Sequence, residues 1–346
     1  MKELVIGDMH FGVKSNSIEW LTKQCELIDK QISKIIDEYN LDRIVFLGDL
    51  FDVRYSINQQ VASEVKKTIR KMSARLYKKN PNAYIVFIAG NHDYYSPVED
   101  AAEYNAYETV FGPEFTKTFP NIYFVTKEPL CKDDSLFLPW YWTDNTDHFD
   151  DLLYRYEFGV DVLAVYCHAD LSIWPGVRIA SLKGIPVYAG HIHFITEDNI
   201  CNLHNIGAAC ALTFGDVNQD RFLYILEDFK IVERIKNETT PKFVRLYNEE
   251  IFNDDPSIYD NSFVQLCINK TNIEKATFTD QIKMLKAKYV DGNIRVHLID
   301  DDEINIDNVD ISSLSFSPNI NEYIQTNLPS HLNTKFDYLK NKINTK

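Results

Sequence analysis

The sequence predicts an α/β protein on two observations. Short apolar segments typical of buried strands alternate with amphipathic segments at helical spacing over residues 1–240. In addition, polar residues of the kinds that bind metal ions directly follow several of these apolar segments. Loops at the carboxyl ends of parallel strands converge at one edge of a sheet, where α/β proteins place their ligands. The order of the elements therefore predicts a site as well as a fold.

The predicted elements of this first region begin with a strand at residues 4–6. Apolar residues then recur at helical spacing from Ile18 to Ile35, which predicts a helix over about 17–39. A strand at 43–47 and a helix over roughly 58–79 come next. Further strands are predicted at 83–89, 122–126, 135–138, 161–167, 186–189, 203–206 and 222–227. This alternation is typical of βαβ units around parallel sheets.

The pattern changes near residue 240, so we predict one domain over residues 1–240 and a smaller α+β domain over residues 241–318. The smaller domain is predicted to contain a strand, a helix and a strand, at 262–268, 274–286 and 293–299. Residues 319–346 are predicted to form a short helical tail. Its apolar residues could pack on the body of the protein or dock onto a partner helix. The docking candidates are Tyr323, Ile324, Leu328, Phe336 and Leu339.

The 346 residues are 45 % apolar, enough to bury a sizeable core in about two domains. The net charge of −15 argues against a generic basic nucleic-acid binder, although a local patch could still bind DNA. The six cysteines form no Cys-x-x-Cys motif, and we interpret them as reduced thiols of a cytoplasmic protein, in the host cytoplasm if the chain is viral. Neither a secretory signal nor a membrane-spanning apolar run is present, so no membrane association is expected.

Carboxylates and an imidazole follow the first two predicted strands. Asp8 and His10 are two residues apart, so both side chains can point the same way at a strand end. Asp49 follows Gly48, and the two oxygens of its carboxylate could bridge two metal ions, which an imidazole cannot do. Asp52 is expected to support the site or cap a helix rather than bind a metal ion. Taken alone, Asp-x-His and Gly-Asp are common polar turns, so the ordered series carries the argument.

The block Gly90-Asn91-His92-Asp93 is the most specific of the series. Asn91 offers a neutral oxygen to a metal ion. The adjacent His92 points in a different direction, which suits a side chain that faces the phosphate instead of the metal. There it could protonate the leaving oxygen or stabilise charge on the phosphoryl oxygens. Asp93 is expected to support the block without binding a metal ion.

The last candidate ligands are imidazoles. His168 follows the predicted strand 161–167, and His191 and His193 lie on one side of a strand end, where each could serve one metal ion. Carboxylate and imidazole ligands together suit Mn²⁺, Fe²⁺ or Zn²⁺ better than Ca²⁺. The sequence contains no His-Glu-x-x-His, Gly-x-Ser-x-Gly or P-loop motif. The series therefore predicts a two-metal centre for phosphoester chemistry.

Two further features have open interpretations. The helix over 58–79 carries several lysines and arginines that could contact phosphates, but a solvated helix face is the more common explanation. The segment Pro139-Trp140-Tyr141-Trp142 could stack on bases, or its aromatic rings could pack at a strand end, which is the more common arrangement. Neither feature identifies a substrate.

The ordered blocks resemble the motifs of the calcineurin-like metallophosphoesterase superfamily. They are Gly7-Asp8-Met9-His10-Phe11-Gly12, Gly48-Asp49-Leu50-Phe51-Asp52, Gly90-Asn91-His92-Asp93 and Gly190-His191-Ile192-His193. Within the superfamily the chain resembles the SbcD-type nucleases of DNA double-strand-break repair. The continuations Val13-Lys14 and Val53-Arg54 make it most similar to the small subunits of the recombination endonucleases of T4-like bacteriophages. The resemblance extends over nearly the whole chain and is loose outside the motifs.

The resemblance implies a four-layer α-β-β-α sandwich, a capping domain that shapes DNA access, and a homodimer. It implies two divalent ions, Mn²⁺ first and Mg²⁺, Fe²⁺ or Zn²⁺ as alternatives. One ion would be held by Asp8, His10, Asp49 and His193. The other would be held by Asp49, Asn91, His168 and His191. Asp49 would bridge the ions, and His92 would be the catalytic residue that binds neither. An SbcC-type coiled-coil ATPase is the implied partner, with residues 319–346 as its docking element.

We therefore expect a metal-dependent DNA exonuclease and endonuclease that acts in recombination and double-strand-break repair. The alternative is a phosphoesterase with a smaller or a protein substrate, such as a cyclic nucleotide or a phosphoprotein, because the same centre would serve it. A non-catalytic scaffold is a further alternative, which the complete ligand set argues against. One block departs from the family pattern, because Gly207-Ala208-Ala209 replaces the usual Gly-Ser/Thr-Pro turn. DNA contacts near this turn are expected to differ.

Overall fold

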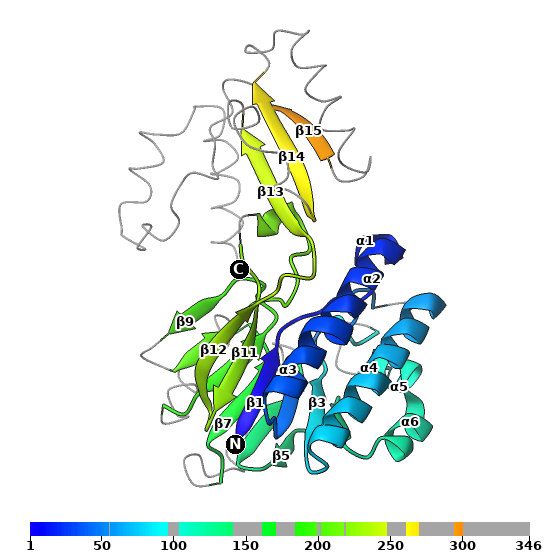
Figure 1. The fold of residues 1–346 in the computed structure, drawn as a ribbon, viewed down its shortest axis with the longest axis vertical. Coiled ribbons are helices and arrows are strands. Elements are labelled where there is room, and N and C mark those ends of the chain that lie inside the picture. The colour runs from blue at the N-terminus through cyan, green and yellow to red at the C-terminus, as the bar shows by residue number, and fades with distance from the viewer. Residues whose placement is uncertain are drawn as a thin grey trace, which may run out of the picture. The chain divides into compact units, whose positions relative to one another are not determined.

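The computed structural model describes residues 1–54, 56–95, 104–140, 161–170, 184–198, 202–217, 219–247, 261–269 and 294–299 (Figure 1). Within these residues the strands form two six-stranded sheets and one three-stranded sheet. The chain divides into one compact unit of Met1–Ile268 with Glu274–His297 and a second of Asn269–Ile273 with Leu298–Lys346. Every candidate ligand lies on the first unit.

The first sheet contains the amino-terminal strand and has the order β12-β11-β1-β2-β3-β4. Its strands are β1 (Lys2–Ile6), β2 (Arg43–Phe46), β3 (Tyr84–Ile88), β4 (Ile122–Val125), β11 (Phe222–Glu227) and β12 (Lys230–Lys236). Strands β1 to β4 run parallel, whereas β11 and β12 extend the sheet antiparallel. Every residue of β2 and β3 is buried, as expected for parallel strands covered on both faces.

The second sheet has the order β5-β6-β7-β8-β10-β9. Its strands are β5 (Leu130–Lys132), β6 (Ser135–Leu138), β7 (Ala164–His168), β8 (Val187–Gly190), β10 (Leu203–Asn205) and β9 (Thr196–Asp198). The four central strands run parallel, and the two short outer strands pair antiparallel with their neighbours. The predicted α/β class is therefore confirmed.

Helices cover one face of the first sheet, where α4 lies beside the continuous run of α2, η1 and α3 (Figure 1). The helical segments are α1 (Val13–Asn16), α2 (Ile18–Glu26), η1 (Leu27–Ile32), α3 (Ser33–Glu38), α4 (Gln59–Lys79), α5 (Ala106–Val110), α6 (Gly112–Thr118) and η5 (Phe214–Asp216). The predicted helix over 17–39 is thus one helical run with a π-helical middle. Helix α4 begins where Asn58 accepts hydrogen bonds from the backbone amides of Gln60 and Val61.

The apolar side chains separate into layers according to the two-residue period of the strands. In β1, Leu4 and Ile6 join the cluster under the helices, whereas Val5 joins the cluster that lies between the two large sheets. The second sheet contributes Phe137 and Tyr166 to that inner cluster. The described residues thus form a helix layer and two sheet layers. The fourth layer of the expected sandwich stays a prediction.

The third sheet has the order β13-β14-β15. Its strands are β13 (Lys242–Tyr247), β14 (Ser262–Asn269) and β15 (Ile294–Ile299). The two strands predicted for the smaller domain are present, and β13 is an additional strand that pairs parallel with β14. The predicted helix 274–286 and tail 319–346 lie outside the described residues, as do the docking candidates. These are Tyr323, Ile324, Leu328, Phe336 and Leu339.

Each strand predicted up to residue 227 is found within a few residues of its predicted bounds. The sequence analysis missed β5, β9 and β12, the short helices α5 and α6, and strand β13. Among the described helices, none is both long and apolar enough to cross a membrane.

Candidate metal centre

The candidate ligands come together where parallel strands of both large sheets end. Asp8 follows β1, Asp49 follows β2 and Asn91 follows β3, all in the first sheet. His168 is the last residue of β7, and His191 follows β8, both in the second sheet. Because side chains from the two sheets contact one another here, the carboxyl ends of both sets of strands share one edge. The remaining candidates, His10, His92 and His193, follow in the same loops.

Asp8, His10 and His193 form the first group of ligand atoms, which all lie within 4.8 Å of one another. The Nε2 atoms of His10 and His193 are 3.2 Å apart, and His193 Nε2 lies 3.7 Å from Asp8 Oδ2. Asp8 is fully buried, and its carboxylate accepts a hydrogen bond from the backbone amide of His191. Two imidazole nitrogens and a buried carboxylate at these separations are a suitable donor set for one divalent cation.

Asp49, His168 and His191 form the second group, again within 4.8 Å. His168 Nε2 lies 3.4 Å from Asp49 Oδ2 and 3.0 Å from Asn91 Oδ1, and His191 Nδ1 lies 2.9 Å from the same amide oxygen. Asn91 therefore belongs to this group by position. Its four side chains provide two imidazole nitrogens, a carboxylate oxygen and an amide oxygen.

Asp49 connects the two groups. Its Oδ2 atom lies 3.4 Å from His168 Nε2 of the second group and 3.6 Å from His10 Nε2 of the first. Asp49 also forms a third cluster, with His10 and His92. Its backbone has a positive φ of 43°, and only 2 % of the residue is exposed. A buried carboxylate between two sets of imidazoles is well placed to bridge two cations.

The polar contacts of Asn91 provide a direct test of whether a cation fits. His168 Nδ1 lies 2.7 Å from the carbonyl oxygen of Leu47, so it carries the proton of the neutral ring, and the Nε2 lone pair faces Asn91. The amide oxygen of Asn91 thus faces acceptors, while its nitrogen faces a donor, Arg54 Nη2, at 2.7 Å. Turned over, the amide would donate to both rings and accept from Arg54 Nη2, so the protein alone can satisfy it. With its oxygen toward the two rings, the amide fits a site in which a cation lies between them.

Electrostatics at the site are dominated by the mixture of buried acids and imidazoles. Although burial opposes ionisation, His168 and His10 hold the pKa of Asp49 well below its usual range. Burial also opposes a charge on His168, yet Asp49 and Asp8 raise its pKa to about 9. Burial lowers the pKa of His191 and His193. The carboxylates therefore favour positive charge at their centre, which divalent cations would supply.

His92 lies beside the first group and is oriented by the backbone of the preceding motif. Its Nδ1 atom donates to the carbonyl oxygen of Asp52 at 2.7 Å, and its backbone amide donates to Asp49 Oδ1 at 2.8 Å. The ring packs edge-on against His10, with ring centroids 4.9 Å apart. With Nδ1 occupied, Nε2 is the ring nitrogen that remains for a substrate.

Asp52 and Asp93 hold the loops that carry the ligands. Asp52 Oδ1 lies 3.3 Å from His10 Nδ1, so it orients this ring, and the helix cap of α4 is Asn58 instead. The buried carboxylate of Asp93 accepts hydrogen bonds from the backbone amides of Gly90, Leu50 and Phe51. Burial and the neighbouring Asp49 raise the pKa of Asp93 to about 7. Each acid thus links residues of two different sequence motifs.

Two glycines allow the ligands to approach so closely. Gly48 has a φ of +106°, and a Cβ there would overlap the ring of His168. A Cβ at Gly90 would overlap the side chain and backbone of Asp49. Glycine is required at both positions because neighbouring strand ends leave no room for a side chain.

Three residues near the site were not assigned a role from the sequence. Gln24, on α2, donates to the carbonyl oxygens of Met9 and His10 and so holds the first ligand loop. Arg221 donates to the carbonyl oxygen of His193 and pairs with Asp216 at 2.7 Å. The third residue, Arg54, lies against Asn91. Most of these contacts join residues that are distant in the chain, so no local sequence pattern predicts them.

The turn that departs from the family pattern packs against the first group. The backbone amide of Ala209 donates to the carbonyl oxygen of Asp8 at 3.0 Å. The backbone amide of Ala208 donates to the carbonyl oxygen of His193 at 3.2 Å. Trp140 lies against the second group, with its ring centroid 4.7 Å from that of His191. Packing at a strand end, the more common of the two arrangements considered for this aromatic segment, therefore describes Trp140.

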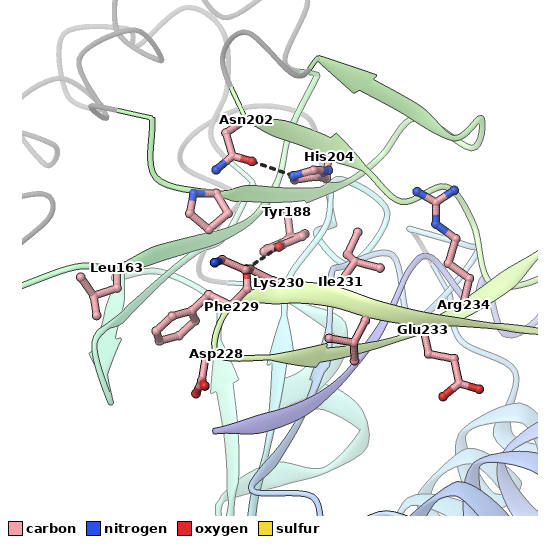
Figure 2. Close-up of a pocket in the computed structure, with 12 residues that line it drawn as sticks. Leu163, Tyr188, Asn202, His204, Asp228, Phe229, Lys230, Ile231, Glu233 and Arg234 are labelled. Atoms are coloured by element: carbon pink, nitrogen blue, oxygen red, sulfur yellow. Dashed lines mark hydrogen bonds between the residues drawn. The ribbon is translucent and has the colours of Figure 1, made fainter.

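A cavity away from the candidate ligands lies between β8 and β10 of the second sheet and the turn that leads into β12 (Figure 2). Its volume is about 900 Å³. His204 stacks on Tyr188 and lies 2.9 Å from Asn202, and the Tyr188 hydroxyl donates to the carbonyl oxygen of Phe229. None of the candidate ligands lines this cavity, so size alone does not identify the reactive site.

Comparison with known proteins adds one finding. Residues 1–259 match the family model described as calcineurin-like phosphoesterase. No curated protein sequence matches the chain. The matched span includes all the candidate ligands and both large sheets.

Proposed function

The chain belongs to the calcineurin-like phosphoesterase family, whose members are metal-dependent hydrolases of phosphoester bonds, and from this premise we propose that it is a DNA nuclease of the SbcD type. The observation that carries its two-metal chemistry is the convergence of two ligand groups on Asp49. The motif continuations through Val53-Arg54 support the narrower assignment, in which the chain resembles the small subunits of T4-like phage recombination endonucleases.

We assign the candidate ligands to two divalent ions, with Mn²⁺ as the preferred metal. The first ion would be held by Asp8, His10, Asp49 and His193. The second would be held by Asp49, Asn91, His168 and His191. When bound, such a pair of ions clamps a phosphate, lowers the pKa of water and stabilises a leaving oxygen. Mg²⁺, Fe²⁺ and Zn²⁺ are the alternatives compatible with these donors.

His92 is the residue to which we assign proton transfer. Its Nδ1 donor is held by the carbonyl oxygen of Asp52, so Nε2 is the atom that faces the reaction. In DNA cleavage it would protonate the leaving 3′ oxygen of the preceding nucleotide, or stabilise negative charge on the phosphoryl oxygens. Its contact with Asp49 through the backbone amide keeps it beside the metal ligands without adding another.

The first test is degradation of end-labelled linear duplex DNA with Mn²⁺, comparing the wild type with Asp49→Asn. Asparagine keeps the shape but loses the charge that would bridge two cations, so activity should fall by about 1,000-fold or more. If the wild type leaves DNA intact but hydrolyses cyclic nucleotides or a phosphopeptide with Mn²⁺, the alternative phosphoesterase function replaces the nuclease. A wild type that binds no Mn, Fe or Zn would support a non-catalytic scaffold.

The role of His92 is tested by His92→Ala. Both metal ions should be retained, as measured by metal content after dialysis, while nuclease turnover falls by roughly 100- to 10,000-fold, the usual contribution of a general acid. Unchanged turnover would remove His92 from the mechanism. Loss of one metal ion would make it a ligand.

The assembly is proposed from the same resemblance: a homodimer that acts with an SbcC-type coiled-coil ATPase. The capping domain of residues 241–318 would shape DNA access, and the tail of residues 319–346 would dock onto the ATPase. Deletion of residues 319–346 should abolish co-purification with a co-expressed ATPase subunit and keep Mn²⁺-dependent hydrolysis of small phosphodiesters. Retained association would show that docking uses another surface.

A further inference from the structure

A second, smaller cavity of about 460 Å³ lies next to the metal centre. It is formed by the chain that follows the second motif and by the start of α5. The residues that line it and matter here are Arg54, Ile57, Tyr95, Tyr104, Asn105 and Thr109. Unlike the cavity of Figure 2, it shares a residue with the surroundings of the candidate ligands, because Arg54 contacts both.

Arg54 connects this cavity to the metal centre. Its Nη2 atom lies 2.7 Å from the side-chain amide of Asn91, one of the assigned ligands, and with the Asn91 oxygen toward the metal site this amide presents its nitrogen, which is no acceptor for Arg54. Its Nε atom is buried, and the described residues offer it no hydrogen-bond acceptor. A guanidinium presents its donors as a planar fork that matches phosphate oxygens. Arg54 is therefore placed to bind a phosphate that the metal ions also contact, with the rest of the ligand extending into the cavity.

Two tyrosines form an aromatic wall of the cavity. Tyr104 is 68 % exposed and Tyr95 is 53 % exposed, which is unusual for such large side chains. The backbone amide of Tyr95 donates to the carbonyl oxygen of Tyr104 at 2.9 Å, so the two residues lie side by side on paired segments. Exposed tyrosine rings beside a phosphate site offer a stacking surface for a nucleobase.

Asn105 adds a directional donor to the cavity. Its Oδ1 atom accepts from the backbone amide of Glu108 at 2.9 Å and caps α5. Its Nδ2 atom is buried and finds no acceptor in the part of the chain that the structure describes, although only 3 % of the residue is exposed. A buried amide donor without a partner is costly unless a ligand completes it. Carbonyl oxygens of nucleobases are suitable acceptors.

We propose that this cavity is a nucleotide subsite: Arg54 binds the phosphate at the metal centre, and the flanking base stacks on Tyr104 and accepts from Asn105. The inference rests on the proposed nuclease function and names where its substrate binds. It also explains how a chain of net charge −15 can engage DNA, because the contact depends on one local cation and stacking rather than on a basic surface.

The test uses chromogenic phosphodiesters that carry or lack a nucleoside. Hydrolysis with Mn²⁺ is compared for the p-nitrophenyl esters of thymidine 5′-phosphate and 3′-phosphate and of methyl phosphate. The wild type should prefer one thymidine ester over the methyl ester. Tyr104→Ala should reduce that preference by roughly 5- to 150-fold, mainly through KM, the loss expected for one stacked base. The matched control is Tyr77→Ala on α4, a tyrosine 56 % exposed, which should keep the wild-type preference.

Arg54 is tested on the same substrates. Arg54→Ala should lower kcat/KM for the thymidine and methyl esters alike, because both carry the phosphate, and Arg54→Lys should recover only part of the loss since an ammonium lacks the planar fork. Equal wild-type rates on all three esters, or a preference unchanged in Tyr104→Ala, would overturn the inference. If Tyr104→Ala loses the preference but the wild type leaves duplex DNA intact, the subsite is supported and the nuclease function is rejected.

Discussion

The same strands carry buried charge at both ends, and the two ends differ in how that charge is balanced. At the amino ends, Glu3 of β1 and Arg43 of β2 form an ion pair at 2.6 Å with neither side chain exposed. At the carboxyl ends, Asp8 and Asp49 lie among imidazoles in equally buried positions. At one end, called here the complete end, each charge is paired with an opposite charge of the protein. The other is arranged so that a cation would complete it.

The amino-end cluster has a partner for each charge. Arg43 donates to Glu3 Oε2 and, through Nη2, to Ser135 Oγ at 2.8 Å and the Tyr166 hydroxyl at 3.0 Å. The Tyr166 hydroxyl in turn donates to Glu3 at 2.7 Å. The guanidinium also packs over the ring of Phe137. This network joins the two large sheets, and its function is therefore structural.

The carboxyl-end cluster instead brings acceptors together. His10 and His193 present Nε2 atoms to each other at 3.2 Å, and Asn91 presents its oxygen to His168 and His191. Contacts between two acceptors destabilise the folded protein unless a proton or a cation lies between the two atoms. The comparison teaches that burial of charge alone does not mark a functional site. What marks it is burial of charge that the protein does not itself neutralise.

The largest effect on stability is expected at the complete end. Arg43→Met leaves the carboxylate of Glu3 buried without its cation, so the free energy of unfolding should fall by about 3–5 kcal/mol. Urea unfolding in the presence of EDTA measures this loss. The double variant Glu3→Gln with Arg43→Met should recover part of it, because no uncompensated charge remains. A single variant as stable as the wild type would show that the pair contributes little.

A smaller effect is expected from filling the open end. Mn²⁺ at 100 times its dissociation constant should raise the free energy of unfolding by about 2.7 kcal/mol per site, since the ions bind only the folded arrangement. Asp49→Asn should lose most of this gain, whereas Arg43→Met should keep it although it starts from a lower stability. If Mn²⁺ stabilised Asp49→Asn as much as the wild type, the ions would bind elsewhere.

Sequence patterns predicted the central strands and the convergence of the candidate ligands for one physical reason: a buried parallel strand is a short apolar run, and the residues after it lie at one edge of the sheet. Strand β12 was missed because its sequence, KIVERIK, is charged and largely exposed, unlike a buried strand. Strands β5 and β9 are only three residues long. The π-helical middle of the helix over 17–39 leaves no distinct mark in the apolar spacing.

Supporting residues were harder to predict than ligands. For Asp52 the sequence leaves two roles open, support of the site or a helix cap; its carboxylate lies 3.3 Å from His10, and the cap of α4 is Asn58. Arg221 contacts His193 from 28 residues away in the chain. Such contacts depend on how sheets stack, which no local pattern encodes. Metal ligands can be predicted because few residue types bind metal ions. The residues that orient these ligands can be of any polar type, so the sequence alone does not single them out.

The smallest effect on stability is expected where neighbouring strand ends pack against each other. Gly90→Ala places a Cβ against Asp49, which must shift, so the free energy of unfolding should fall by about 1–3 kcal/mol, as for other overpacked sites. Because Asp49 is the shared ligand, the stabilisation by Mn²⁺ should shrink as well.

Gly112→Ala is the matched control for this last variant. Its φ of +65° strains alanine by about 1–2 kcal/mol, yet a Cβ there meets no described atom within 4 Å. Both variants should thus lose similar stability in EDTA, measured by urea unfolding. Only Gly90→Ala should lose the response to Mn²⁺, because only there does the added methyl group displace a ligand. An equal response in both would mean that Asp49 can move without weakening the site, and that the close approach of the strand ends serves packing alone.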